Sequence, residues 1–439
     1  TVDAIMGWSV HDRLHEIEKD MVIVVPMKNE RLKLLQGVLY GIPHQCQVIV
    51  VSNSPRAPMD RYSIEVDALE SFARYTGKSM IVAHQRDPEL GAALAEAGYE
   101  ELLDETGVVR NGKAEGMLLG TLLASLTGRK YIGFIDADNY FPGSVHEYVR
   151  LYSAGFAQAR SHHAMVRINW HSKPKVVDNT LFFARYGRTS TVTNRFMNRL
   201  VTFYTGFETE GIRTGNAGEH AMTMELALSL DYASGYAVEP YHIIDLLERY
   251  GGISAPRPQE MAGERVDVFQ IQSRNPHLHE AKGEEHVEGM IQSALSVIYH
   301  SPVCPPTLRE RIEKELTERG ILAEGEEVPK PRYYRTFRRR DPNGLMPFLE
   351  KTEHAHLYVG SSFNPAAAAQ AQDEAVARAR TRAPDGLPQP GSPEAGSTSA
   401  EEGSEAGRKK KTKKKEKKRP KASAKKGSGG SSSGTGADA

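Results

Sequence analysis

Short apolar runs alternate with amphipathic stretches along the first 140 residues of the chain. Runs rich in β-branched residues, typical of strands buried on both faces, occur at 21–27 (MVIVVPM), 47–54 (QVIVVSNS), 79–85 (SMIVAHQ) and 130–140 (KYIGFIDADNY). Segments with apolar residues at helical spacing lie between them, at 31–42, 63–77 and 113–128. This order of elements predicts an α/β fold with a largely parallel sheet and helices on both faces.

Polar residues follow each of the four predicted strands. The carboxyl ends of parallel strands share one edge of the sheet, and ligands bind at that edge in open α/β folds. The polar clusters are 26–30, 52–54, 85–86 and 136–138. We therefore expect them to form one ligand site.

The most informative cluster is Asp136-Ala137-Asp138. Two carboxylates two positions apart at a strand end can hold a hard divalent cation and the phosphates it bridges. A phosphatase of the haloacid dehalogenase type would need Thr or Val where this chain has Tyr140, and a Rossmann dehydrogenase would need a glycine-rich turn after the first strand. A nucleotide-sugar transferase of the GT-A type fits, and the alternative is that the acids only cap a helix.

The end of the chain differs in composition from the rest. All 33 aromatic residues precede residue 364. Basic and acidic residues number 56 each, but thirteen basic residues and one acidic residue lie between Arg408 and Lys426, so this run carries +12 and the remainder −12. We expect 364–439 to be a disordered tail with a short helix at 365–380, and we expect no nucleic-acid binding except nonspecifically through this tail.

Cysteine content and hydropathy exclude several classes of protein. Two cysteines, Cys46 and Cys304, exclude a disulfide scaffold and an all-cysteine zinc site. The first 20 residues are charged, and the early apolar runs are far shorter than the roughly 20 residues of a membrane-spanning helix. We expect a cytoplasmic protein that does not enter the membrane.

A series of motifs makes the prediction more specific. In order along the chain they are VVPMKNERLKLLQGVLYGIP, VSNS, HQRDP, NGKAEGM, YIGFIDADNYFPG, NAGEHAM, GYAVEPYH and RNPHLHEAKGEEH. This series resembles the mannosyl-3-phosphoglycerate synthase family, roughly over residues 21–299. The resemblance implies a Rossmann-like GT-A fold and a retaining, metal-dependent transfer of mannose from GDP-mannose to 3-phosphoglycerate, a step toward the compatible solute mannosylglycerate.

The resemblance also implies a domain organisation. We expect an N-terminal segment at 1–20, a GT-A domain that binds donor and acceptor at 21–250, and a helical C-terminal subdomain with a metal-ligand loop at 251–363, followed by the tail. The expected assembly is a homodimer.

The resemblance places the sugar nucleotide at the strand ends. The donor-binding residues that it implies are Pro26, Lys28, Asn29, Glu30, Ser52, Asn53, Gln85, Lys113 and Asp136. Lys113 would contact the diphosphate, since an ammonium at a helix start adds to the backbone N–H donors there. The alternatives are simple turns at the strand ends and a solvated lysine.

The expected catalytic residues are Asp136, Asp138 and Glu219, and two segments could complete the catalytic centre. Asp138 is the expected metal ligand, joined by His279 with His277 as second choice, and the expected cation is Mg²⁺, with Mn²⁺ or Co²⁺ as alternatives. If this segment is extended, residues two apart point to opposite faces, so one of the two histidines should reach the metal. Glu219 follows a glycine and would hold sugar hydroxyls or orient the acceptor; the alternative is an acid in the first turn of a helix.

An arginine-containing loop is the candidate acceptor site. Gly187, Arg188, Thr189 and Ser190 resemble the acceptor loop of the related glucosyl-3-phosphoglycerate synthases. A guanidinium suits phosphate and carboxylate in a two-point contact. The alternative functions are the glucosyl enzyme on the same acceptor, and a non-catalytic GT-A scaffold that binds polyanions through the basic tail.

Overall fold

The structure is a computed structural model of the 439-residue chain. It describes residues 12–177, 180–182, 187–253, 265–279, 283–335, 342–346, 349, 355–361, 363–364 and 366. The chain divides into two compact units, Thr1–Ala383 and Pro384–Ala439. The predicted tail and its short helix lie outside the described residues except for 364 and 366, so the following concerns the first unit.

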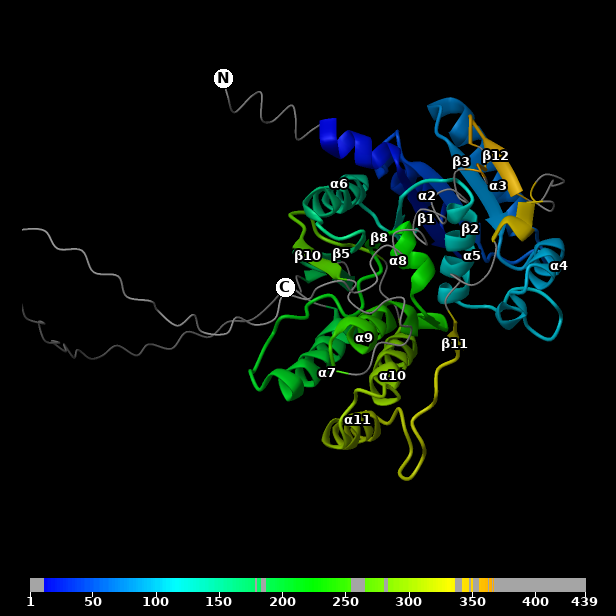
Figure 1. The fold of residues 1–439 in the computed structure, drawn as a ribbon. Coiled ribbons are helices and arrows are strands. Elements are labelled where there is room, and N and C mark those ends of the chain that lie inside the picture. Colours follow the sequence, from blue (N-terminus) through cyan, green and yellow to red (C-terminus); the bar gives the residue numbers. More distant parts are fainter. Residues whose placement is uncertain are drawn as a thin grey trace, which may run out of the picture. The chain divides into compact units, whose positions relative to one another are not determined.

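An eight-stranded sheet in the order β10-β5-β8-β4-β1-β2-β3-β12 runs through this unit (Figure 1). Its strands are β1 (Met21–Met27), β2 (Gln47–Ser52), β3 (Met80–His84), β4 (Tyr131–Phe134), β5 (His163–Asn169), β8 (His220–Thr223), β10 (Val266–Gln272) and β12 (Ala355–Tyr358). The pairs β1–β2, β1–β4, β2–β3 and β5–β10 are parallel, whereas β8 is antiparallel to β4 and β5, and β12 is antiparallel to β3. The four predicted strands therefore form a parallel core within a mostly parallel sheet, as expected.

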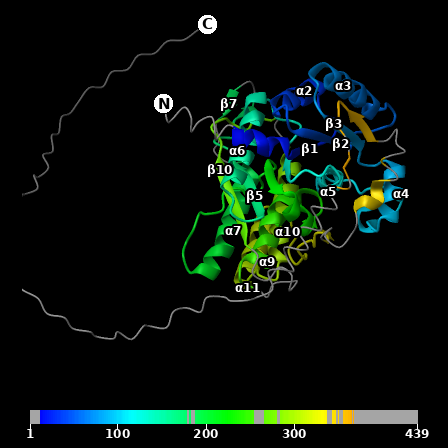
Figure 2. The same cartoon turned by 45° about the horizontal axis from the view of Figure 1, so that its top comes forward.

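Helices cover both faces of the sheet (Figure 2). They are α2 (Leu32–Gly41), α3 (Arg61–Thr76), α4 (Pro88–Glu96), α5 (Lys113–Ser125), α6 (Pro142–Gln158), α7 (Arg188–Thr205), α8 (Met224–Ser229), α9 (Val238–Tyr250), α10 (Glu284–Tyr299) and α11 (Pro306–Glu318). Along β1, Val22 and Val24 belong to the core beneath α4, α5 and α8, whereas Ile23 and Val25 belong to the core beneath α2, α3 and α6. Because successive side chains of β1 enter cores on opposite faces of the sheet, the run 21–27 is apolar throughout.

Close packing of α5 on β1 determines where the helix begins. A Cβ atom on Gly120 would lie 2.4 Å from Cγ1 of Val24, so only glycine lets the two backbones approach this closely. The first residue of α5, Lys113, is thereby held at the sheet edge where the parallel strands end.

A third core joins α7, α9, α10 and α11. The two-stranded pair of β9 (Tyr232–Ala233) and β11 (Tyr333–Tyr334) and the hairpin of β6 (Lys175–Val177) and β7 (Thr180–Phe182) are separate from the main sheet. The segment expected to form a C-terminal subdomain also supplies β10 and β12, at opposite ends of the main sheet. The 251–363 segment is therefore interleaved with the main domain as well as forming part of the helical layer.

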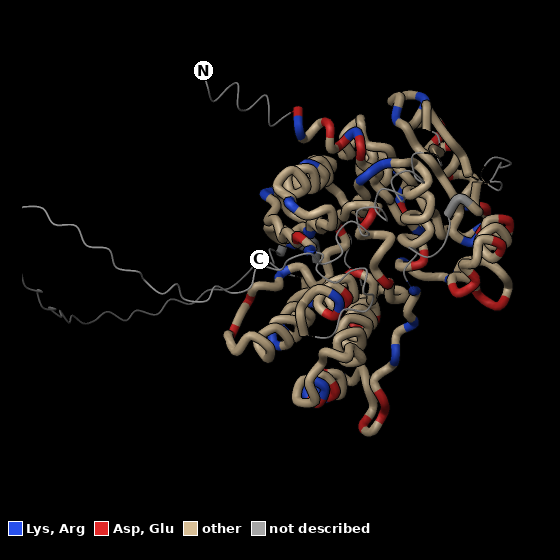
Figure 3. The backbone as a smooth tube through the Cα atoms, in the orientation of Figure 1, with Lys and Arg blue, Asp and Glu red and all other residues tan. Residues whose placement is uncertain are grey.

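Charges of both signs are spread along the described backbone (Figure 3). Among the described helices, none combines the length and apolarity needed to cross a bilayer.

Candidate active site

Seven strand ends bring the candidate residues to one edge of the sheet. The carboxyl ends of β1, β2, β3 and β4 meet there, as the sequence predicts. β8 runs in the opposite direction and pairs His220 with Phe134, so Glu219 lies at the same edge as the Asp136–Asp138 turn. β5 has the same direction as β4, and β10 is parallel to β5, so the segments after these strands also reach this edge.

Lys113 and Asp136 form the centre of this site. The Lys113 ammonium lies 2.7 Å from Oδ1 of Asp136 and 2.8 Å from Oε1 of Glu239, at the start of α9. Burial would lower the pKa of Lys113, but the two carboxylates outweigh it and hold the pKa well above its ordinary value. Burial would likewise raise the pKa of Asp136, but Lys113 and Lys173 outweigh it and lower the pKa. The two groups are therefore a charged pair at neutral pH.

Gly218 allows the NAGEHAM segment to pass directly beside this pair. A Cβ atom at this position would lie 2.4 Å from Oδ2 of Asp136 and 3.2 Å from the Lys113 ammonium. Glycine is thus required at position 218, because the backbone there passes close to the Asp136 carboxylate. The same close passage brings the next residue, Glu219, into the site.

Asn111 connects the ends of β1 and β2 to the start of α5. Its Oδ1 accepts hydrogen bonds from Lys28 at 3.3 Å and from the amide of Asn53 at 2.7 Å. Gln85 is buried, and its amide donates to the carbonyl oxygens of Arg110 at 2.6 Å and Gly112 at 3.1 Å. These bonds hold the loop that precedes Lys113. Gln85 therefore positions this loop.

A second network supports the turn after β1. Ser52 and Ser54 donate to the two oxygens of the buried Glu65 carboxylate, at 2.7 and 2.8 Å. Ser54 Oγ also accepts from the backbone N–H of Asn29 at 2.6 Å, and Asn29 has a positive φ of 57°. Glu65 thus fixes the left-handed turn that presents Lys28 and Asn29, both exposed, at the sheet edge.

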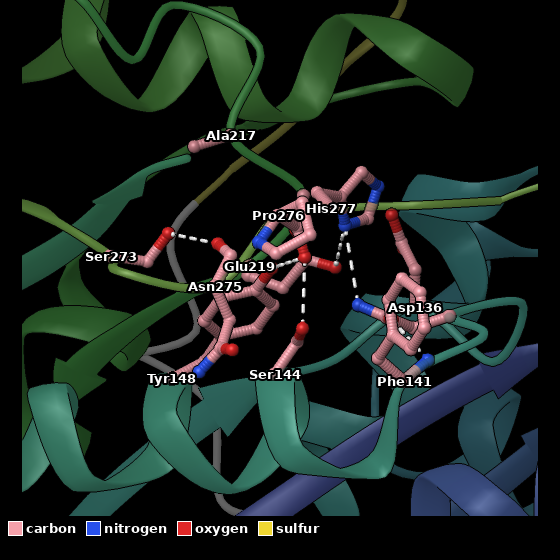
Figure 4. Close-up of polar contacts among 12 residues, drawn as sticks. Asp136, Phe141, Ser144, Tyr148, Ala217, Glu219, Ser273, Asn275, Pro276 and His277 are labelled. Atoms are coloured by element: carbon pink, nitrogen blue, oxygen red, sulfur yellow. Dashed lines mark hydrogen bonds and ion pairs between the residues drawn. The ribbon is translucent and has the colours of Figure 1, made fainter. Parts of the chain in front are cut away.

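The loop after β10 is anchored to α6 (Figure 4). Ser144 and Tyr148 donate to the carbonyl oxygen of Pro276 at 2.8 and 3.1 Å. The Glu147 carboxylate accepts from the backbone N–H groups of Arg274 at 2.6 Å and Asn275 at 2.8 Å. These contacts hold the following residue, His277, against the catalytic edge.

His277 and Glu219 form a buried contact (Figure 4). Nδ1 of His277 lies 3.3 Å from Oε1 of Glu219 and 3.3 Å from the amide nitrogen of Asn139. Burial, together with Asp136, raises the pKa of Glu219 to about 8, and burial lowers the pKa of His277 well below its ordinary value. Near neutral pH these shifts favour a protonated Glu219 facing a neutral imidazole.

The two histidines are neighbours. Their ring centroids are 5.1 Å apart, so the expectation that they point to opposite faces is wrong. The loop is irregular at these residues, and the alternation of an extended strand does not apply. His279 is the half-buried one of the two and lies close enough to Asp136 to lower its pKa.

The turns that carry Asp138 and His279, the predicted metal ligands, are joined by a hydrogen bond. The N–H of Tyr140 donates to the carbonyl oxygen of Leu278 at 2.9 Å, which joins the loops that carry these two side chains. Within the described residues no group of three or more His, Cys, Asp or Glu side chains could hold a metal ion. A carboxylate and an imidazole fit a cation whose other ligands are diphosphate oxygens and water.

The predicted acceptor residues form the first turn of α7. Gly187 precedes the helix, Thr189 and Ser190 are mostly buried, and Arg188 is exposed and ion-paired with Glu284 at the start of α10. Arg195, two turns further, pairs with Glu315 at 2.5 Å and does not take part. The Arg188 guanidinium is thus an exposed donor at this helix start, where the first backbone N–H groups of an α-helix have no partner within the helix.

Comparison with known proteins shows the family of this chain. The sequence matches the family described as mannosyl-3-phosphoglycerate synthase (osmo_MPGsynth) over residues 6–349. The chain belongs to this family. It is 46% identical over 350 residues to the mannosyl-3-phosphoglycerate synthase of Pyrococcus furiosus, covering 80% of this chain and 89% of that protein. It is 38% identical over 315 residues to the Aeropyrum pernix protein of the same name, covering 72% and 80%. The resemblance inferred from the motifs is confirmed, and the chain is a glycosyltransferase.

Solved structures give more remote likenesses. Glucosyl-3-phosphoglycerate synthase from Mycobacterium tuberculosis, in complex with Mn²⁺, UDP and phosphoglyceric acid, has a TM-score of 0.43 at 18% identity, over 66% of this chain and 82% of that one. Mannosyl-3-phosphoglycerate synthase from Rubrobacter xylanophilus has a TM-score of 0.42 at 16% identity, over 74% and 90%. Likenesses of this size are too remote to transfer a ligand or the role of a residue.

Several members of the site are absent from the predicted set. They are Glu65, Asn111, Lys173 and Glu239, together with Trp170. Glu239 lies in the GYAVEPYH motif that the family resemblance uses, and Asn111 lies in NGKAEGM. Lys173 follows HAMVRIN, an alternating run that forms β5. Polar residues after this strand, like the four clusters after the predicted strands, are the sequence signal that indicates Lys173.

Proposed function

We propose that this edge of the sheet transfers mannose from GDP-mannose to the 2-hydroxyl of 3-phosphoglycerate with retention of the α configuration. The observation that carries the proposal is the Lys113–Asp136 pair, held at 2.7 Å at the start of α5 and the end of β4. It combines a permanent cation, a helix N-terminus and an aspartate turn, which together suit a sugar diphosphate.

The nucleoside is proposed to lie over the ends of β1 and β2. Lys28, Asn29 and Asn53 present polar groups there that Glu65 and Asn111 hold in place. Pro26, Glu30 and Ser52 shape the same turns, and Lys113 would contact the diphosphate on leaving its present partners. Preformed turns of this kind lower the entropy cost of binding the nucleotide.

A divalent cation is proposed to be held by Asp138 and His279. Its chemistry there would be to neutralise the negative charge of the departing GDP. His277 fits this role less well, because its Nδ1 already faces Glu219 and Asn139. Mg²⁺ is the cation to test first, then Mn²⁺ and Co²⁺.

The acceptor is proposed to bind between α7 and Glu219. The helix start and Arg188 would hold the phosphate, since both offer N–H donors to an anion. In the transfer step a bond forms between the acceptor 2-oxygen and C1 of mannose, and the bond from C1 to the diphosphate oxygen breaks. The hydroxyl proton passes to the leaving diphosphate on the same face, which accounts for retention.

The decisive experiment is release of GDP from GDP-mannose in the presence of 3-phosphoglycerate and Mg²⁺. We expect turnover that depends on all three components, and a product that contains mannose and phosphoglycerate in equal amounts. Absence of turnover with a protein that still binds GDP would overturn the proposal and favour a non-catalytic scaffold.

The alternative with the same acceptor is a glucosyl transferase. Competition between GDP-mannose, GDP-glucose and UDP-glucose separates the two functions, and we expect GDP-mannose to be preferred. The homodimer and the cytoplasmic location remain predictions.

A further inference from the structure

Lys173 occupies a defined position beside the site. The reaction proposed above gives this residue no role. Its ammonium lies 3.8 Å from the centroid of the Trp170 ring, and Trp170 in turn stacks on His277 at 4.7 Å between ring centroids. The cation is thus held over an indole that is itself fixed by the loop after β10.

The same ammonium lies between the acceptor helix and the acidic centre. A Cβ atom on Gly187 would be 3.3 Å from Cδ and 3.8 Å from Nζ of Lys173, and 3.9 Å from Oγ of Ser190. On the other side Glu219, Asp136 and Asp138 act on Lys173 electrostatically, and they oppose the lowering of its pKa that burial causes.

Lys173 differs from Lys113 in its partners. Lys113 is ion-paired with two carboxylates, at 2.7 and 2.8 Å. In the part of the chain that the structure describes, Lys173 is in contact with the Trp170 ring but forms no direct ion pair. A half-buried ammonium that faces acids without pairing with one is suited to an anion that arrives between them.

We propose that Lys173 binds the carboxylate of the acceptor. This inference rests on the proposed function. In 3-phosphoglycerate the carboxylate is attached to the carbon that carries the reacting hydroxyl, whereas the phosphate is one carbon further away. Lys173 is half-buried and feels the charges of Asp136 and Glu219, whereas Arg188 is exposed at the first residue of α7 and pairs with Glu284. The inner cation therefore takes the carboxylate and the outer one takes the phosphate.

This arrangement also explains how an anion enters an acidic centre. Asp136 and Asp138 repel an approaching carboxylate, and Lys113 is occupied by Asp136 and Glu239. Lys173 supplies a positive charge between the start of α7 and these acids. Two anion sites, one at Lys173 and one at Arg188, would select for molecules that carry both a carboxylate and a phosphate.

The test compares Lys173→Met with Arg188→Lys on three acceptors: 3-phosphoglycerate, glycerol 3-phosphate, which lacks the carboxylate, and glycerate, which lacks the phosphate. We expect Lys173→Met to raise the KM for 3-phosphoglycerate on the order of ten- to a hundred-fold and to remove the preference over glycerol 3-phosphate. Arg188→Lys should instead reduce the preference over glycerate. Lys173→Arg, which keeps the charge, should restore part of the affinity.

Two measurements exclude a purely structural effect. The Kd of GDP-mannose, measured by calorimetry without acceptor, should stay within about two-fold of the wild type in Lys173→Met, and the melting temperature should not change. Lys130→Met is the matched control, because Lys130 is an exposed lysine paired with Asp20 at 2.8 Å.

The outcomes separate the two proposals. A wild-type protein that releases no GDP with 3-phosphoglycerate removes the proposed function, whatever the variant does. An active wild type whose Lys173→Met variant still prefers 3-phosphoglycerate over glycerol 3-phosphate overturns only the role of Lys173. A fall in kcat with an unchanged acceptor KM also overturns it, and would mean that Lys173 positions Trp170 and His277.

Discussion

The donor and acceptor sides of the sheet edge are built in different ways. On the donor side, hydrogen bonds within the protein already satisfy the polar groups: Asn111 joins Lys28 to Asn53, and Glu65 joins two serines. On the acceptor side charges dominate, with Lys173 over an indole and Arg188 on an exposed helix start.

This difference has consequences for binding. The hydrogen bonds of the donor side hold a shape before the ligand arrives, and loss of one bond is partly compensated by water. A separated cation does little for the fold, but it interacts strongly with an anionic ligand. We therefore expect donor affinity to be distributed over many residues and acceptor affinity to be concentrated in a few charges.

The largest effect is expected for a substitution of Asp138, because transfer between the two sides depends on this proposed metal ligand. Asp138→Ala should lower kcat at least on the order of a hundred-fold, since the loss of charge stabilisation in a transition state costs several kcal/mol. GDP release at saturating cation measures it, and the melting temperature should stay unchanged. Glu105→Ala, at an exposed acid of the same unit, is the control.

The histidines refine the same test. His279→Ala should shift the cation concentration needed for half-maximal activity, and His277→Ala should instead alter the packing of Trp170 and Glu219. Equal, mild effects of both substitutions would remove them from the metal site.

On the acceptor side, Arg188→Lys keeps the charge but loses the planar two-point contact. We expect kcat/KM for 3-phosphoglycerate to fall on the order of ten- to a hundred-fold while the Kd of GDP-mannose stays unchanged. Arg195→Lys on the same helix should have little effect on either, because Arg195 is paired with Glu315. Collapse of donor affinity in Arg188→Lys would mean that the two sides are assigned in reverse.

On the donor side, Asn111→Ala removes the acceptor of two hydrogen bonds. The expected loss of GDP-mannose affinity is about three- to ten-fold, because both bonds are exposed and water can replace part of each, with the acceptor KM unchanged. A hundred-fold loss in Asn111→Ala would contradict the idea that donor affinity is distributed.

Glu219 should make stability depend on pH. Burial raises its pKa in the folded protein from the ordinary 4.5 to about 8. Between these values the folded state holds a proton that the unfolded state has lost, so this contribution to the free energy of unfolding is full below pH 4.5 and is lost as pH rises toward about 8. Urea unfolding of the metal-free protein at several pH values should show Glu219→Gln gaining stability relative to the wild type across this window. If the free energy of unfolding depended on pH in the same way for the two proteins, the raised pKa of Glu219 would be refuted.

The smallest effect is expected from the second compact unit. Deletion of Pro384–Ala439 should leave kcat and both KM values within about two-fold, because every proposed site residue precedes it. The truncated protein should elute from a cation-exchange column at lower salt, since a clustered charge of +12 is lost. Lost turnover at an unchanged melting temperature would assign the tail a role in catalysis.

Much of the donor side could be predicted from the sequence. The apolar runs predicted β1 to β4, the periodic segments predicted α2, α3 and α5, and the polar clusters were correctly placed at one edge. These elements follow one another along the chain, and the right-handed β-α-β connection leaves little freedom in how consecutive parallel strands are arranged. Local pattern and handedness are therefore sufficient to bring Lys28, Asn53, Lys113 and Asp136 together.

The acceptor side depended on the tertiary structure. The antiparallel insertion of β8 between β4 and β5 brings Glu219 to the edge, and α9 brings Glu239 to Lys113. The position of Lys173 beside Gly187, and the packing of His277 against His279, follow from loops whose conformation has no periodic signal. Hydrophobic periodicity indicates which face of an element is buried but not which distant element covers it, because that choice is made by packing among the whole set.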